Sequence, residues 1–176
     1  KEMDAWNVVD RTDDMNVFQG IWAFKIKSFP DGLIKKFKAR FCARGDQQLE
    51  GIDFFETYAP VVKWTTVRLL LILEVLLKLK SKQGDVTAAF LHGKLEEGEN
   101  VYVEMPTGFK KPGKVLKLKK TLYGLKQSPR SFWKYLTKAM EACGMTVSKL
   151  DPCLLVGDKV FCISYVGDIL FWTKDE

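Results

Sequence analysis

The chain has 176 residues, 47% hydrophobic and 28% charged, a composition typical of soluble globular proteins with one substantial core or two small lobes. The net charge of +6 and the pI near 9.1 suit a polyanionic partner such as nucleic acid, although charge alone does not decide this. The four cysteines form no CxxC pair and His92 is the only histidine, so the sequence indicates neither a zinc site nor a disulfide framework.

The longest apolar run, residues 67–79, is too short and too often interrupted to be a membrane anchor. Arg68, Glu74 and Lys78 break it, and it falls short of the ~20 residues that cross a bilayer. It therefore predicts a core helix. The chain starts with Lys1 rather than methionine and shows no signal-peptide pattern, so we expect a fragment of a longer reading frame whose natural ends are missing.

The first part of the chain predicts a basic hairpin. Residues 1–20 have weak periodicity and are interpreted only as a lead-in segment. Residues 21–27 then alternate as a strand, residues 28–32 supply turn chemistry, and residues 33–42 resume a β pattern that contains several lysines and an arginine.

A helix and a short strand should follow the hairpin. After a loop rich in glycine and aspartate, Thr65 or Thr66 is positioned to cap a helix. Because its apolar residues, 67–79, occupy most sides, we expect this helix to be largely buried. Residues 83–86 predict a strand that ends in a turn of small residues.

The second half of the chain predicts one more helix and several strands. The helix begins at Ser128, with Pro129 at its first position, and Gly144 ends it. Strands are expected at residues 101–105, 115–118, 153–156, 160–166 and 169–173. The pairs Gly157-Asp158 and Gly167-Asp168 are interpreted as two-residue turns that join the last three strands.

Two acidic residues are the best candidates for metal-dependent chemistry. Nucleotidyl transfer needs carboxylates from different strands that hold two divalent ions about 4 Å apart. Asp85 lies at the end of a predicted strand and Asp168 at the tip of a predicted hairpin. Their spacing does not establish that they meet, because Asp168 equally fits a plain tight turn and Asp85 equally fits a helix cap or a turn acid.

Five collinear blocks cover nearly the whole chain and resemble copia-type retrotransposon reverse transcriptases. They are residues 38–45, 51–62, 83–93, 122–133 and 165–168. The first two look like the fingers signature of that family, the third resembles its first palm motif, and the fourth resembles the segment beside template and incoming nucleotide. The last block, Tyr165-Val166-Gly167-Asp168, takes the place of the family's Tyr-Val-Asp-Asp turn. So long an ordered match leaves little room for chance.

The resemblance implies an α+β fold: the fingers of a right-hand polymerase and an incomplete palm with an antiparallel sheet. Residues 1–82 are then expected to form a fingers-like lobe, and residues 83–93 the palm motif with its first aspartate. Residues 94–127 would return through the fingers, and residues 128–176 would supply the palm helix and the last hairpin. The thumb and the RNase H domain are expected to be absent.

The resemblance also implies a metal site. Asp85 and Asp168 are expected to be catalytic and to bind two Mg²⁺ ions. Gly167 stands where the family has a further metal-binding aspartate, and glycine has no side chain that coordinates a metal. We therefore expect impaired catalysis, unless Asp168 moves into the lost role or the glycine is an error or a lesion of a single copy.

Further roles implied by the resemblance concern nucleotide and nucleic acid. Lys38 and Arg40 would meet the triphosphate, Phe90 would screen against a ribose 2′ hydroxyl, and a turn at Tyr123-Gly124 would let a base approach. Phe90 equally fits a core aromatic, and a glycine in any turn has the same explanation. A basic group that tracks a nucleic-acid backbone, or forms a plain solvated face, comprises Lys119, Lys120, Lys126 and Arg130.

The sequence thus predicts a fragment of an RNA-directed DNA polymerase with an impaired metal site. The alternatives are a non-catalytic nucleic-acid-binding remnant and a decayed element fragment. Expected partners are an RNA or DNA template-primer, a dNTP and the remaining Pol domains, with no membrane. The resemblance implies a cytoplasmic location within virus-like particles.

Overall fold

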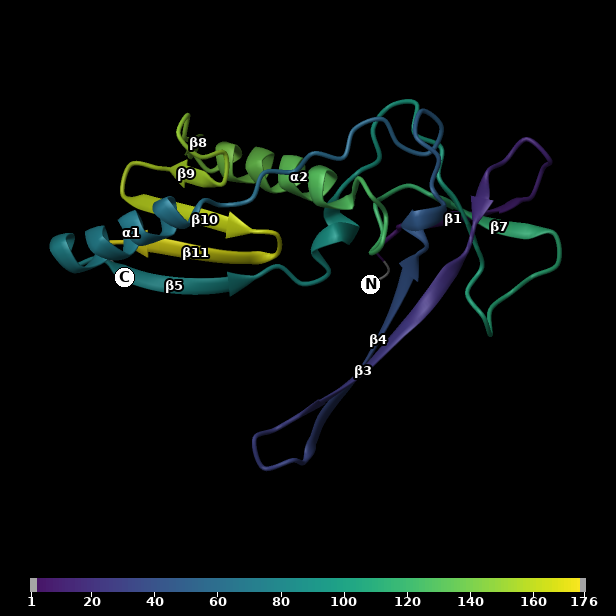
Figure 1. Cartoon of the computed structure of the whole chain (residues 1–176), viewed down its shortest axis with the longest axis horizontal. Helices are drawn as coiled ribbons and strands as arrows, with labels where there is room; N and C mark the ends of the chain where they lie inside the picture. The colour runs from purple at the N-terminus through teal and green to yellow at the C-terminus, as the bar shows by residue number, and fades with distance from the viewer. Residues whose placement is uncertain (1–2, 175–176) are drawn as a thin grey trace. The chain divides into compact units, whose positions relative to one another are not determined.

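The computed structural model describes residues 3–174, which form two compact units (Figure 1). Unit 1 combines the chain up to Thr57 with Lys94–Ser128, and unit 2 combines Tyr58–Gly93 with the chain from Pro129 onward. The α+β class is confirmed, since both helices and antiparallel sheets are present. Residues 58–82 group with unit 2 rather than with the residues before them, because the helix and strand they contain pack there.

Unit 1 is built on a four-stranded sheet with the order β1-β7-β6-β2. Strands β1, β7 and β6 pair antiparallel, whereas β2 runs parallel to β6. The bounds are Trp6–Asp10 for β1, Val17–Phe18 for β2, Tyr102–Glu104 for β6 and Lys114–Leu118 for β7. The interpretation of residues 1–20 as a mere lead-in was wrong, because β1 and β2 pair with strands from the second half of the chain. Such long-range pairing cannot be predicted from a local sequence pattern.

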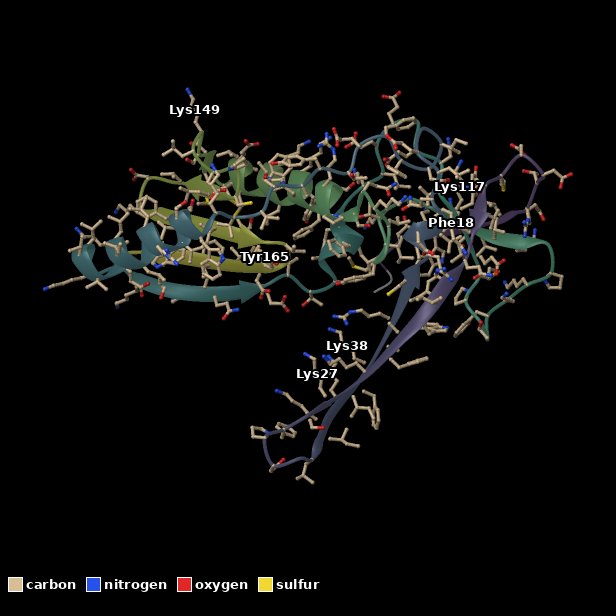
Figure 2. The ribbon with its side chains drawn as sticks, viewed as in Figure 1. Phe18, Lys27, Lys38, Lys117, Lys149 and Tyr165 are labelled. Carbon is tan, nitrogen blue, oxygen red and sulfur yellow. The ribbon has the colours of Figure 1, made fainter. Side chains whose placement is uncertain are left out.

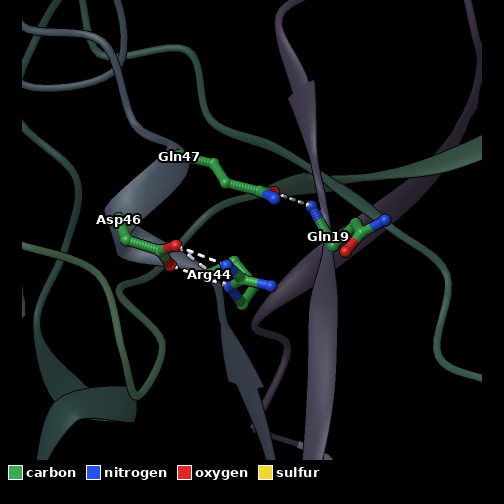
Figure 3. Close-up of polar contacts among 4 residues, drawn as sticks. All are labelled: Gln19, Arg44, Asp46 and Gln47. Carbon is green, nitrogen blue, oxygen red and sulfur yellow. Dashed lines mark hydrogen bonds and ion pairs between the residues drawn. The ribbon is translucent and has the colours of Figure 1, made fainter.

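The predicted basic hairpin is confirmed as a separate two-stranded sheet of unit 1. Its strands are β3, Gly20–Ser28, and β4, Ile34–Ala43. A short 3-10 helix, η1, Gly45–Gln47, follows β4. Figure 3 shows how η1 is attached: Gln19 N donates to Gln47 Oε1 at 2.9 Å, and Arg44 forms an ion pair with Asp46. These contacts hold the base of the hairpin against the loop that follows it.

Unit 2 is built on a five-stranded antiparallel sheet with the order β5-β11-β10-β9-β8. The bounds are Lys80–Asp85 for β5, Thr146–Val147 for β8, Leu154–Val156 for β9, Val160–Tyr165 for β10 and Asp168–Thr173 for β11. The helices of this unit are α1, Trp64–Leu77, α2, Ser128–Ala142, and the 3-10 helix η2, Ala89–His92. The predicted helix from Ser128 is therefore confirmed, and Gly144 beyond its end has a φ of +82°. Among residues 3–174, no helix is both long and apolar enough to cross a membrane.

The two faces of the unit 2 sheet carry different cores. Successive residues of a strand point to opposite faces, and in β10 Cys162 belongs to the cluster with Phe132 of α2. Its neighbour Ile163 belongs to the cluster with Leu70 of α1 and Trp172 of β11. Each helix thus covers one face of the sheet. Burial of Cys162 raises the pKa of its thiol to about 12.

Helix α1 departs from the sequence prediction in its start and in its burial. It begins at Trp64 and has no side-chain cap of its own, so the expected cap by Thr65 or Thr66 was wrong. It is also far from buried: within the helix only Thr66 and Leu70 are buried, and most of its large aliphatic side chains are exposed. An apolar sequence favours burial of a helix, but it does not determine whether another element packs on its outer face.

The missing cap is supplied by a residue distant in sequence, Asp151. Its Oδ2 atom accepts hydrogen bonds from Lys63 N at 2.9 Å and Thr66 Oγ1 at 2.6 Å, and its Oδ1 atom accepts one from Cys153 N at 2.9 Å. Burial raises the pKa of this carboxyl, but the hydrogen bonds from Thr66, Lys63 and Cys153 outweigh burial, so the net pKa is lowered. Asp151 therefore ties the start of α1 to the segment before β9.

We predict that Asp151→Ala lowers the free energy of unfolding by about 3 kcal/mol, because three donors lose their buried acceptor. A folded-state pKa below the unfolded-state value stabilises the protein above the unfolded-state pKa, and this stability is lost as the pH falls through the folded-state pKa. Urea denaturation between about pH 6 and 3 should therefore show a shallower acid loss in Asp151→Asn than in the parent. The exposed Asp158→Asn is the matched control, and an equal change in both variants would contradict the role of Asp151.

The last hairpin turns one residue earlier than predicted. Tyr165 and Asp168 are register partners, so the two-residue turn is Val166-Gly167 rather than Gly167-Asp168, and Asp168 is the first residue of β11. Val166 carries the left-handed conformation, with a φ of 54°. The preceding turn shifts in the opposite direction, one residue later than predicted, to Asp158-Lys159, because Gly157 N donates to Val160 O at 2.8 Å.

Candidate metal and nucleotide site

The two candidate acids lie directly opposite each other on neighbouring strands of unit 2. Asp85 ends β5 and Asp168 begins β11, and the two are register partners in an antiparallel pair. Directly opposite residues share a face of the sheet with Cβ atoms about 5 Å apart, and both side chains are exposed. The structure therefore brings together the two carboxylates that sequence spacing left unconnected.

The turn beside these acids is fixed against the end of β5. Val86 N donates a hydrogen bond to Gly167 O at 2.8 Å. A Cβ atom at position 167 would lie 3.7 Å from Asp85 Oδ1 and 3.3 Å from the Cβ atom of Ala89. Gly167 itself is not among the residues with positive φ, since that conformation falls on Val166. Position 167 therefore faces the same acidic corner, and its backbone does not require glycine.

The acidic corner holds two oxygen-donating side chains rather than three. Within residues 3–174, no group of three or more histidine, cysteine, aspartate or glutamate side chains is placed to hold a metal ion. Magnesium is commonly bound by one or two carboxylates together with substrate phosphates and water. Asp85 and Asp168 thus fit a phosphate-assisted magnesium site, but not a complete site made by the protein alone.

Phe90 lies in η2, close to this corner, and packs into the α2 side of unit 2. Its ring meets the ring of Phe132 edge-on, with centroids 6.3 Å apart, and it is partly buried against that core cluster. This packing matches the core-aromatic alternative. The role as a screen against the 2′ hydroxyl stays a prediction.

Lys38 and Arg40 lie on one face of the β3–β4 hairpin in unit 1. Figure 2 shows Lys27 and Lys38 on the same side of the hairpin. The register pairs Lys25 with Lys38 and Lys27 with Lys36, so like charges stand directly opposite each other. Such pairs destabilise a hairpin in isolation, and a polyanionic ligand would offset that repulsion.

Three cations of this face, Lys25, Lys27 and Lys36, were not among the predicted site residues. The signal that identifies them is the two-residue period of the strands, because all three share a face with Lys38 and Arg40. Lys35 points the other way and lies over the ring of Phe29, with its Nζ atom 5.3 Å from the centroid. The opposite face of the hairpin is largely aromatic, with Trp22 beside Phe24 and Phe41.

Tyr123 and Gly124 form a turn that packs on the backbone at the end of β4. Ala43 N donates to Tyr123 O at 2.7 Å, and the guanidinium of Arg40 lies 5.3 Å from the centre of the Tyr123 ring. Gly124 has a φ of +92°, and a Cβ there would overlap the carbonyl oxygen of Ala43. Close packing within the protein is thus sufficient reason for this glycine, and its predicted role beside a base stays a prediction.

The four remaining basic candidates are divided between the two units. Arg130 belongs to unit 2 and donates to Tyr58 O, whereas the three lysines belong to unit 1. Lys119 forms an ion pair with Asp4, and Lys120 donates to Met3 O at 2.7 Å. Lys126 lies over the ring of Phe54, 4.8 Å from its centroid. Their side chains therefore have internal partners, and their contact with nucleic acid stays a prediction.

Comparison with known families identifies the class of this α+β chain. Residues 3–176 match the family model described as reverse transcriptase (RNA-dependent DNA polymerase). The chain therefore belongs to the reverse transcriptase family.

The curated relatives place the chain more narrowly, among copia-type transposons. It is 40% identical over 163 residues to the retrovirus-related Pol polyprotein from transposon TNT 1-94 of Nicotiana tabacum, covering 88% of this chain and 12% of that protein. It is 38% identical over 161 residues to the corresponding polyprotein from transposon RE1 of Arabidopsis thaliana, covering 88% and 11%. It is 31% identical over 144 residues to the transposon Ty1-ER2 Gag-Pol polyprotein of Saccharomyces cerevisiae, covering 78% and 8%. The chain thus spans about an eighth or less of the length of these relatives.

Proposed function

We propose that this chain is the part of a copia-type reverse transcriptase that binds template-primer and nucleotide, with Asp85 and Asp168 as its metal ligands. The observation that carries the proposal is the register pairing of these two aspartates on β5 and β11. Membership of the reverse transcriptase family supports the same proposal. Unit 1 would then act as the fingers and unit 2 as the palm, and the remaining Pol domains of the longer relatives are the expected partners in a virus-like particle.

Two magnesium ions would supply the charge that activates a 3′ hydroxyl and stabilises the leaving pyrophosphate. The carboxylates of Asp85 and Asp168 would hold them with help from substrate phosphates. Gly167 contributes no oxygen donor to this corner, and loss of a metal ligand is expected to lower the rate by orders of magnitude. We therefore propose that the chain binds its substrates but polymerises poorly.

The cationic face of the β3–β4 hairpin is proposed to hold phosphate groups. Arg40 has a planar guanidinium that forks onto two phosphate oxygens, while Lys38 acts as a point charge. The stacked like charges of Lys25 with Lys38 and Lys27 with Lys36 support this use, since repulsion across the hairpin is relieved by an anion. A second candidate function, non-catalytic nucleic-acid binding, is favoured by the combination of this face with Gly167.

A salt titration of template-primer binding tests the proposal. The chain should bind a labelled RNA–DNA primer-template on filters with an affinity that falls steeply with salt, and should fail at Mg²⁺-dependent primer extension. Lys38→Ala should reduce the slope of log affinity against log salt by roughly 0.7 to 0.9, the contribution of one phosphate contact.

Lys35→Ala is the matched control, because it removes the same charge from the other face of the hairpin. Equal effects of the two substitutions would argue against a phosphate-binding face. Absence of binding even at low salt would remove both candidate functions, and robust primer extension by the parent chain would overturn the proposed impairment.

A further inference from the structure

Helix α1 exposes a largely apolar face. At 3.6 residues per turn, most of its exposed large side chains fall on one side of the helix, and these are Trp64, Leu69, Leu71, Ile72, Val75 and Leu76. The exposed Leu77 lies toward the side of Leu70. Val75 is 78% exposed and Leu76 is 70% exposed, whereas Leu70 on the opposite side is 1% exposed and packs on the sheet. A helix that served only to cover the sheet would carry polar residues on this outer face.

An open cavity adjoins the end of this helix. It has a volume of about 380 Å³, and Leu77, the last residue of α1, forms part of its wall. The other apolar walls are Leu79, Val160 and Phe161, and the ionic residues around it are Asp158, Lys159 and Lys174. A cavity of this size accommodates inserted side chains of a partner, which a flat surface does not provide.

The charges along α1 that face solvent are positive. Arg68 lies within the apolar face, and Lys63 and Lys78 flank the helix at its two ends. The acid of the helix, Glu74, is turned inward, where its carboxylate accepts hydrogen bonds from Trp172 Nε1 at 2.7 Å and Ser81 Oγ at 2.8 Å. A second copy of the chain would bring the same cations to the interface, so the charge pattern favours an acidic partner over self-association.

We propose that the exposed face of α1, together with the cavity at its end, binds an amphipathic helix whose apolar stripe is flanked by aspartate or glutamate. The stripe packs on Ile72, Val75 and Leu76, and the flanking carboxylates pair with Arg68 and Lys78. This is the helix-in-groove mode of recognition, in which apolar anchors give affinity and flanking charges give orientation. The inference goes beyond the proposed function, because it involves no residue of the metal or phosphate sites.

The test uses two fluorescein-labelled synthetic helices of about 20 residues, long enough to be helical alone. Both carry the same leucine stripe, flanked by glutamates in one peptide and by lysines in the other. Fluorescence anisotropy with the full chain should give at least roughly tenfold tighter binding of the glutamate peptide. Val75→Asp should weaken that binding by more than about tenfold, and Arg68→Glu should shift the preference toward the lysine peptide.

Phe109→Asp is the matched control, because it places an acid on a comparably exposed apolar residue of unit 1. It should leave peptide binding unchanged. Thermal unfolding of each variant should match that of the parent, since the substituted side chains are exposed. Primer-template binding by Val75→Asp should also be normal, which separates failure of this inference from failure of the proposed function.

Three outcomes would overturn the inference. Equal binding of both peptides with no reversal in Arg68→Glu would show unspecific apolar adhesion. Self-association in sedimentation equilibrium that Val75→Asp abolishes would assign the face to a second copy. Binding to vesicles of phosphatidylcholine and phosphatidylserine, without binding of either peptide, would assign it to a membrane surface.

Discussion

Gly167→Asp is expected to increase the affinity of the chain for Mn²⁺ at least roughly tenfold and to raise metal-dependent nucleotide incorporation by orders of magnitude. The positive φ of the turn falls on Val166, so an aspartate at 167 is not forced into a left-handed conformation. Its Cβ atom would lie 3.7 Å from Asp85 Oδ1, which directs the new carboxylate toward the existing pair. The contact of 3.3 Å with the Cβ atom of Ala89 requires only a small shift.

Electron paramagnetic resonance titration of Mn²⁺ measures this gain without reference to activity. Gly167→Asn is the matched control, because it adds a side chain of the same size without the charge. The combination of Gly167→Asp with Asp85→Asn should lose most of the gain, since the two carboxylates act on one ion. An unchanged Mn²⁺ affinity in Gly167→Asp would show that Asp85 and Asp168 do not belong to a metal site.

Gly124→Ala should destabilise unit 1 by more than about 4 kcal/mol, which is exceptional for the addition of one methyl group. The added Cβ would overlap the carbonyl oxygen of Ala43, which is backbone and cannot rotate away. The turn is also held in place by the hydrogen bond from Ala43 N to Tyr123 O. Urea denaturation, followed by tryptophan fluorescence, measures the loss.

Gly108→Ala separates the two causes of this loss. Gly108 has the same φ of +92°, but a Cβ there meets nothing within 4 Å. Its substitution should therefore cost only the conformational strain of about 1–2 kcal/mol. If both variants lose the same stability, strain alone explains the effect and the close packing at Ala43 contributes nothing.

Local patterns in the sequence were enough to predict the elements that depend on their own residues. The alternation of residues 21–27 and 33–42 predicted the basic hairpin, and Pro129 with Gly144 bracketed helix α2. The collinear motif blocks also predicted the family, because an ordered match over most of a chain does not require knowledge of its packing. The short strands β1 and β2 were missed, since their stability comes from partners in the second half of the chain.

The candidate site was likewise predicted only in part from the sequence. The sequence named Asp85 and Asp168 as candidates, and the family resemblance pointed to Gly167 as a position where an acid was expected. It did not establish that the two aspartates meet. Their register was fixed by the turn, which falls at Val166-Gly167 rather than one residue later. A shift of one residue would have sent Asp168 to the opposite face of the sheet.

By itself the sequence determined which side chains are available: two candidate acids, the cations of the hairpin, and a helix that is apolar on most sides. Only the tertiary structure decided which of them share a face, because strand register and helix docking depend on contacts between residues far apart in the chain. The cap of α1 by Asp151 and the exposure of Val75 both depend on such long-range packing.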